Sequence, residues 1–412
     1  MRSLGLGLTA IVPLAACLSL AACAKDPDYG GMGTAGSGGG GGGTGGGGGG
    51  YTPPALKLSH PNPIISRNAM TASSPGNGKF VVDGAYHNGG WAAMKPTAAT
   101  PSWVAIKLAA GPTRILVSWD DGGTYNYQDP AGTTVYGFPA DYHFDVSADS
   151  TTGMDGTWTA AVTPGTSDPV TVTGNAVRTR AHAIDFTGKT WIKMIITAAP
   201  ANESGNGVQI GEIDVHDISA TAPGIPQDTW FFMGDSITAF AFDRRAVNQP
   251  SFAAAISTAT SQTYYPAMIN GGIGGEKSTD GLARLGQVLS LNPDYHFIAL
   301  CYGTNDAAGG QIPTATFQSN MQMMIDMVKA AGREPVIPHI PWATDGSHGA
   351  VPMYDVVIDT LTQTNHLQVG PDLTAYFMAH TDQLMSDNLH PADPGQMAMN
   401  QLWADAMRVV YP

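Results

Sequence analysis

The strongest constraint on the fold is an alternation of strand-like and helix-like segments that begins near residue 229 and continues to residue 412. Apolar stretches of strand length are predicted at 229–235, 264–269, 296–302, 334–341 and 366–370. Segments with helical periodicity are predicted at 250–261, 278–291, 314–331, 350–365 and 394–410. Such alternation forms a parallel sheet with helices on both faces. We therefore expect an α/β three-layer domain over residues 226–412, with its site at the carboxyl ends of the strands.

The preceding part of the chain has a different sequence pattern, in which short segments of alternating apolar and polar residues are separated by turn residues. These segments are 103–108, 113–119, 142–147, 158–163, 170–173 and 191–197, and 208–215 resembles a closing strand. Many short strands at regular spacing indicate an antiparallel sandwich. The sequence predicts an all-β sandwich or jelly roll over residues 53–222.

Tryptophans are concentrated in this predicted sandwich. Five of the eight fall in it: Trp91, Trp103, Trp119, Trp158 and Trp191. Sugar rings stack on exposed tryptophan, but tryptophan at strand spacing belongs more often to the core. Both interpretations stay open at the level of sequence.

The N-terminus has the form of an export signal. A positive tip at Arg2 precedes an apolar stretch that reaches Ala22. Leu20-Ala-Ala-Cys23 resembles the bacterial lipoprotein box, which implies cleavage after residue 22 and lipidation of Cys23. Two alternatives are Cys17, which follows Leu14-Ala-Ala, and an uncleaved membrane anchor. We expect an exported lipoprotein whose membrane partner is reached through Cys23, on the cell surface or the periplasmic face of a bacterial envelope.

A glycine-rich segment follows, and its composition cannot bury apolar area. Residues 23–52 are therefore expected to be a flexible linker, and the rest of the chain soluble and tethered. The formal net charge is −14 and only 13% of residues are charged. Because phosphate neutralisation needs clustered Lys and Arg, nucleic acid is excluded as a partner.

Four short motifs lie where the predicted strands of the second domain end or just before its last helix. They are Gly234-Asp-Ser236, Asn270-Gly-Gly-Ile-Gly-Gly275, Gly303-Thr-Asn-Asp306 and Asp387-Asn-Leu-His390-Pro391. Each motif alone is common. Their order and their positions together are specific.

These motifs resemble the SGNH hydrolases, also called the GDSL esterase and lipase family, over residues 226–412. The resemblance implies a flavodoxin-like fold and ester hydrolysis through an acyl-enzyme. It implies that Ser236 is the nucleophile, His390 the base and Asp387 the residue that orients the imidazole. The amides of Ser236 and Gly275 and the side chain of Asn305 would form the oxyanion hole.

Residue chemistry is consistent with these roles. A serine hydroxyl needs a base to take its proton, and histidine titrates near neutrality. A carboxylate three residues before that histidine can lie on the same side of a turn and fix its tautomer. The G-x-S-x-G elbow of the α/β-hydrolases is absent, and Glu276 stands where many SGNH members carry Asp.

Other polar residues near the strand ends have plainer interpretations. Asp235 and Asp306 are expected to bond loop amides, and Cys301 to be a buried small residue. His339 and Trp342 are candidates for lining the substrate pocket. The remaining histidines show no metal-ligand spacing, so we predict no catalytic metal and no cofactor.

The first domain resembles the discoidin or coagulation-factor C-type jelly rolls. The likeness rests on the succession Asp83-Gly84, Trp91, residues 103–108, residues 142–147 before Gly156-Thr-Trp158, and a late Gly-Glu-Ile. It implies a galactose-binding-like module of the kind attached to secreted enzymes that act on glycans.

The expected function is removal of O-acetyl groups from polysaccharides such as xylan, with acetylated polysaccharide as the substrate partner. Two alternatives are open. One is a lipase, lysophospholipase or thioesterase, which needs an apolar acyl groove. The other is a glycan-binding surface protein with an inactive hydrolase domain.

Overall fold

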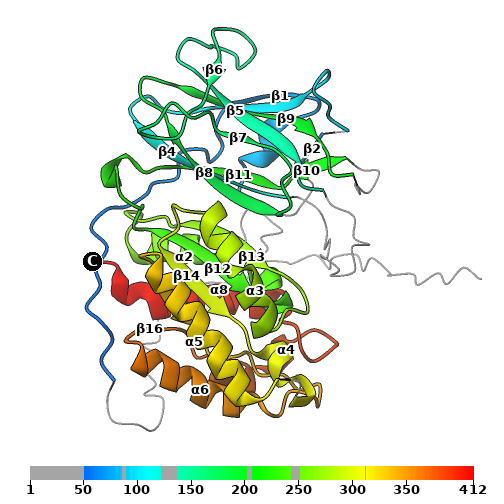
Figure 1. Cartoon of the computed structure of the whole chain (residues 1–412), viewed down its shortest axis with the longest axis vertical. Coiled ribbons are helices and arrows are strands. Elements are labelled where there is room, and N and C mark those ends of the chain that lie inside the picture. The colour runs from blue at the N-terminus through cyan, green and yellow to red at the C-terminus, as the bar shows by residue number, and fades with distance from the viewer. Residues whose placement is uncertain are drawn as a thin grey trace, which may run out of the picture. The chain divides into compact units, whose positions relative to one another are not determined.

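A computed structural model describes residues 51–85, 90–93, 95–121, 137–201, 207–242, 251–310 and 312–412 (Figure 1). Residues 51–412 form one compact unit. The predicted signal peptide, the linker up to residue 50 and Cys23 lie outside the described residues. No helix in the described ranges is long and apolar enough to span a membrane.

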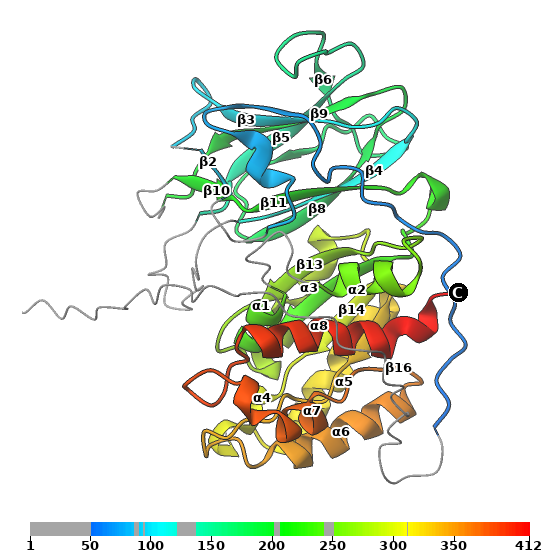
Figure 2. The same ribbon diagram turned by 180° about the vertical axis from the view of Figure 1, so that it is seen from behind.

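The first domain consists of antiparallel sheets (Figure 2). The larger sheet has the order β1 (Thr71–Ser74), β3 (Ser102–Lys107), β9 (Trp191–Ala198), β5 (Asp141–Ser147) and β6 (Thr159–Ala160), with β7 (Thr171–Val172) paired to β5. A second sheet has the order β11 (Glu212–Asp217), β4 (Arg114–Asp120) and β8 (Thr179–Asp185). A two-stranded sheet pairs β10 (Val208–Ile210) with β2 (Trp91–Ala93).

The apolar faces of the two larger sheets share one core. Val104 of β3, Phe144 of β5 and Val117 of β4 belong to the same buried cluster. Trp91, Trp119 and Trp191 are buried, so these three are core residues. Trp103 and Trp158 are partly exposed, and the Lys193 ammonium lies 4.6 and 3.6 Å from their ring centres.

Two features of this domain differ from the sequence-based expectation. The expected closing strand at 208–215 is divided at Gly211, so that β10 and β11 belong to different sheets. Strand β8 was not predicted, because its sequence Thr-Arg-Ala-His-Ala-Ile-Asp has little apolar alternation.

The second domain contains a parallel sheet, as predicted. Its order is β13 (Ala267–Gly272), β12 (Thr229–Gly234), β14 (Phe297–Cys301), β15 (Glu334–Ile337) and β16 (Gln368–Val369). The helices are α1 (Ser236–Ala241), α2 (Phe252–Ala259), α3 (Ser278–Leu291), α4 (Thr304–Ala307), α5 (Thr314–Ala330), α6 (Val351–Thr364), α7 (Leu373–Ala379) and α8 (Asp393–Met407). Short 3-10 turns are η1 (Gly78–Val81), η2 (Ser219–Thr221), η3 (Ala308–Gly310), η4 (Thr381–Gln383) and η5 (Arg408–Val410).

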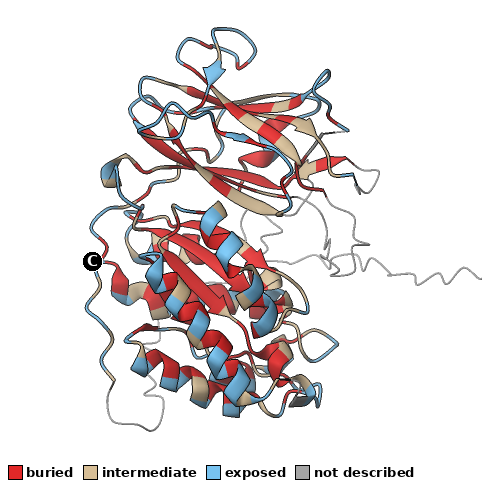
Figure 3. Ribbon diagram, in the orientation of Figure 1, coloured by how far each residue is buried: buried red, intermediate tan, exposed pale blue. Residues whose placement is uncertain are grey.

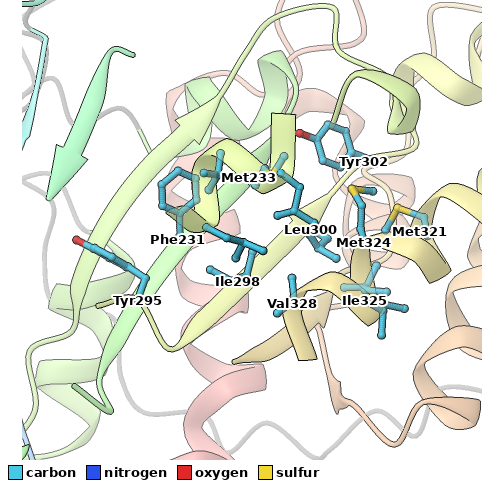
Figure 4. Close-up of a cluster of buried hydrophobic side chains, with 14 of the residues drawn as sticks. Phe231, Met233, Tyr295, Ile298, Leu300, Tyr302, Met321, Met324, Ile325 and Val328 are labelled. Carbon is cyan, nitrogen blue, oxygen red and sulfur yellow. The ribbon is translucent and has the colours of Figure 1, made fainter. Parts of the chain in front are cut away.

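The strands of this sheet consist largely of buried residues (Figure 3), and both faces of the sheet pack in buried clusters. On one face, Phe231 and Leu300 of the strands pack in one cluster with the α5 stripe that includes Met321 and Met324 (Figure 4). On the other, Trp230 and Phe232 share a cluster with residues of α2 and α8. The alternate residues of β12 thus face opposite helix layers. The methionine-rich stripe of α5 is therefore part of the core.

The segment before the sandwich packs on the second domain. Leu58 is buried in the cluster of α2 and α8, and its amide donates to the carbonyl oxygen of Val410 at 2.8 Å. The Tyr51 hydroxyl donates to Leu367 O at 2.6 Å. The chain therefore contacts the second domain before it enters the first.

Candidate active site

A tight turn at the end of β12 places Ser236 at the edge of the sheet. The Asp235 carboxylate accepts from the Ile237 amide at 2.9 Å and caps α1. A Cβ atom on Gly234 would lie 2.2 Å from Thr238 Oγ1, and one on Gly272 would lie 2.3 Å from the Ala239 nitrogen. Only glycine permits this close approach of strand and helix. This is why the apolar strand ends abruptly at Gly-Asp-Ser.

His390 connects Ser236 to Asp387. Its Nε2 lies 2.8 Å from Ser236 Oγ, and its Nδ1 lies 2.7 Å from Asp387 Oδ2. The other Asp387 oxygen accepts from the amides of Leu389 and His390, each at 3.0 Å. These amide bonds hold the carboxylate beside the ring. A base in contact with both the nucleophile and an orienting acid is the arrangement that serine catalysis requires.

The charge of Asp387 suits this role. Its partial burial works against ionisation, but the hydrogen bonds from His390 and from the backbone amides outweigh burial and lower its pKa. The carboxylate is therefore ionised at neutral pH. An ionised Asp387 can stabilise the imidazolium that forms when His390 takes the serine proton.

The candidate oxyanion donors come from three adjacent strand ends, since β12 lies between β13 and β14. Ser236 is the first residue of α1, so its amide has no acceptor within the helix. Gly275 has a φ of +78°, and no described residue accepts from its amide. Asn305 Nδ2 donates to Glu276 O at 2.9 Å, which leaves its second hydrogen for another acceptor.

A network that the sequence did not reveal supports the Gly275 loop. The Arg284 guanidinium pairs with the Glu276 carboxylate at 2.7 Å and donates to Gly271 O at 2.7 Å. The Tyr302 hydroxyl donates to Glu276 Oε2 at 2.8 Å. Burial raises the pKa of Glu276, and the Arg284 charge opposes this rise. The only sequence signal was the unusual Glu after Gly275.

The other polar residues at the strand ends bond local groups. The Asp306 carboxylate accepts from Ser278 N at 3.0 Å and from Ser278 Oγ at 2.5 Å, which ties the β14 loop to α3. Burial raises the pKa of Asp235 to about 7. Burial also raises the pKa of the Cys301 thiol, so the thiol stays protonated.

Two candidate pocket residues lie elsewhere. The ring nitrogens of His339 bond Asp372 at 3.1 Å and Asp359 at 3.0 Å. Trp342 is partly buried against the two core clusters of its domain. Neither is among the described residues that line the cavity at Ser236. In the described ranges, no three His, Cys, Asp or Glu side chains are grouped to hold a metal ion.

Comparison with known proteins agrees with this arrangement. Residues 232–398 match the GDSL-like lipase/acylhydrolase family. This part of the chain is therefore similar to GDSL-type acylhydrolases. An arylesterase of Vibrio mimicus is 30% identical over 130 residues, which are 31% of this chain and 64% of that protein. The chain therefore spans less than two thirds of this relative's length.

Solved structures of similar proteins match the same share of the chain. A lipase/acylhydrolase from Enterococcus faecalis is 22% identical with a TM-score of 0.38, and the match covers 44% of this chain and 96% of that one. The acetylxylan esterase Axe2 from Geobacillus stearothermophilus is 17% identical with a TM-score of 0.36, over 44% and 94% of the two chains.

Proposed function

We propose that the protein is a serine esterase that removes O-acetyl groups from polysaccharides. The observation that supports the reaction is the continuous hydrogen-bonded chain from Ser236 Oγ through His390 to Asp387. The acetyl specificity and the polysaccharide substrate are inferred from the resemblance of the first domain to glycan-associated jelly rolls.

In the proposed reaction, Ser236 Oγ attacks the ester carbonyl carbon while His390 Nε2 takes the hydroxyl proton. The amides of Ser236 and Gly275 and the Asn305 side chain donate to the oxyanion. His390 then returns the proton to the alcohol oxygen as that bond breaks. Water then loses a proton to the same nitrogen and attacks the acyl carbon. The bond to Ser236 Oγ breaks, His390 returns that proton to Oγ, and acetate is released.

A second candidate is an esterase for longer acyl chains. Apolar side chains line part of the cavity at Ser236, among them Phe242, Met268 and Val288. An alkyl chain would be favourable against these groups. The two candidates share one chemistry and differ in acyl-chain preference.

The test is acid release from acetylated xylan, p-nitrophenyl acetate and p-nitrophenyl octanoate by the full chain in detergent, beside its Ser236→Ala variant. We expect serine-dependent activity on both acetyl esters and little on octanoate. A preference for octanoate would favour the second candidate. No serine-dependent release from any ester would leave a glycan-binding role as the remaining proposal.

We also propose that the enzyme is anchored by lipid at Cys23. The support is the Leu-Ala-Ala-Cys sequence and the glycine-rich stretch after it. Cell fractionation of the Cys23→Ser variant tests this proposal. We expect loss of the protein from the membrane fraction, and unchanged membrane association would contradict lipidation at this residue.

A further inference from the structure

The cavity at Ser236 is shared by the two domains. It has a volume of about 420 Å³. On the esterase side it is lined by Ser236, Phe240 and His390, and on the sandwich side by Asp121, Arg178 and Glu212. These last three lie at or just beyond the ends of β4, β8 and β11.

The sandwich wall is fixed against the esterase domain by a shared core. Ala181 and Ala183 of β8 belong to the same buried cluster as Leu289 and Tyr295. A hydrogen bond also joins the two domains: the Ala181 amide donates to Asn292 Oδ1 at 3.1 Å. Buried apolar contact of this kind holds the wall in one position.

An inter-domain ion pair lies at the same boundary. Arg114 Nη2 lies 2.8 Å from Asp294 Oδ1, and Arg114 Nη1 donates to Gly224 O at 2.7 Å. Both partners are largely buried, at 9% and 13% side-chain exposure. Loss of either partner would leave a buried charge, so the contact disfavours separation of the domains.

On the sandwich side, the residues that line the cavity include an ion pair between Arg178 and Asp121. Arg178 donates to both oxygens of Asp121, from Nη2 to Oδ1 at 2.8 Å and from Nε to Oδ2 at 3.1 Å, which is the two-pronged geometry that fixes a guanidinium. The Asp121 side chain is only 3% exposed, whereas that of Arg178 is 23% exposed. Asp121 is thus the buried residue that holds the Arg178 side chain in place. Of the two residues, Arg178 is the one that a molecule in the cavity can contact.

The volume of the cavity and the residues that line it indicate which kind of ligand it can bind. A volume of about 420 Å³ lies within the usual range for small-molecule sites and is far more than an acetyl group fills. The Arg178 guanidinium is charged and partly exposed, and an alkyl chain packed against it would offer no hydrogen-bond acceptor. The oxygen of a sugar hydroxyl can accept a hydrogen bond from it, and the aromatic ring of Phe240 offers an apolar surface to a sugar face.

We infer that the sandwich domain forms part of the substrate site, and that Arg178, held by Asp121, binds hydroxyl groups of the sugar that carries the ester. This inference rests on the proposed function and adds a specificity residue outside the esterase domain. The sandwich then acts as one wall of the catalytic cavity.

The test compares Arg178→Gln with the wild-type full chain on acetylated xylotriose and on p-nitrophenyl acetate. Both substrates transfer acetyl, but only the first has sugar hydroxyls. Loss of one charged hydrogen-bond donor predicts a rise of about tenfold in KM for the xylotriose ester, with kcat nearly unchanged. For p-nitrophenyl acetate we expect kcat/KM to stay within about twofold.

Two further variants make the result decisive. Lys107→Gln removes the same charge from an exposed site on β3 and should leave both substrates unaffected. Arg178→Lys keeps a charge beside Asp121 but loses the planar fork, so it should give a smaller KM rise for the sugar ester even if Arg178→Gln folds poorly.

The outcomes separate this inference from the proposed function. If the wild type cleaves the xylotriose ester and both Arg178 variants do so with unchanged KM, the inference is wrong and the proposed function stands. Equal losses on both substrates would also overturn it, since they indicate a general structural effect. If the wild type cleaves only p-nitrophenyl acetate, the polysaccharide proposal fails together with the inference.

Discussion

Asn305 donates a hydrogen bond to the backbone carbonyl oxygen of Glu276 at 2.9 Å. This bond joins the loop after β14 to the loop after β13. One side chain is therefore both a candidate oxyanion donor and the link that holds the loop of a second candidate donor, Gly275. The two loops are expected to act as a unit.

Replacing Asn305 tests this double role. We expect Asn305→Ala to lower kcat for p-nitrophenyl acetate by about 10²- to 10³-fold, because a donor to the oxyanion is lost. KM should change little, since that donor acts mainly in the transition state. Steady-state kinetics with a thermal melt measure both effects. A change confined to KM would argue against an oxyanion role.

The Glu276 carboxylate should affect stability as well as rate. Glu276→Gln leaves the Arg284 charge without its partner in a largely buried position, which is expected to cost about 3 kcal/mol of unfolding free energy. Displacement of the Gly275 loop should lower kcat by about tenfold or more. Denaturant unfolding and kinetics provide the two readouts.

Glu334→Gln is the matched control for that variant. Glu334 lies in the same domain at the start of β15, and the described residues include no ion pair with it. We expect stability within about 0.5 kcal/mol of the wild type. If both variants behave alike, the Glu276–Arg284 pair has no special role.

The segment before the sandwich is expected to stabilise the second domain. Leu58→Ala removes a side chain that is 2% exposed and should cost about 2 to 5 kcal/mol in urea unfolding. Leu56→Ala, in the same segment but only partly buried, should cost about 1 kcal/mol. Equal and small losses would show that the segment is not part of the folded core.

His339 should make stability depend on pH. Burial by itself lowers its pKa, but hydrogen bonds with Asp372 and Asp359 and the charge of Asp355 outweigh burial and raise the pKa to about 9. The protonated ring therefore stabilises the fold below its unfolded pKa of about 6.5. This stabilisation is lost as the pH rises through about 9.

Thermal melts of His339→Gln between pH 6 and pH 10 measure this effect. We expect the variant to be less stable by about 1 to 2 kcal/mol at pH 6, a value reduced for the exposure of the two carboxylates, and nearly equal to the wild type at pH 10. His60→Gln, at an exposed site, is the matched control variant. A constant difference across the range would contradict an ionic role.

Much of the second domain was predictable from the sequence. The predicted helix at 278–291 coincides with α3, and the predicted strand at 229–235 differs from β12 by one residue. Ser236, Asp387 and His390 were predicted together, and the structure places them in hydrogen-bond contact. Local periodicity predicts the strands and helices, and strand ends of a parallel sheet meet at one edge. The roles of the three residues were implied by the resemblance of the motifs to the SGNH hydrolases.

The sequence by itself determined the order of strands and helices in the second domain and the residues gathered at its strand ends. Only the tertiary structure decided that Arg178, directly before β8, lines the cavity at Ser236 and that Leu58 packs beside α8. It also decided that His339 bonds the carboxylates of Asp372 and Asp359 and does not line that cavity. The physical reason is the sequence separation of the contacts. Periodicity shows which face of one helix or strand is buried, whereas these contacts join segments far apart in the chain and leave no local sequence pattern.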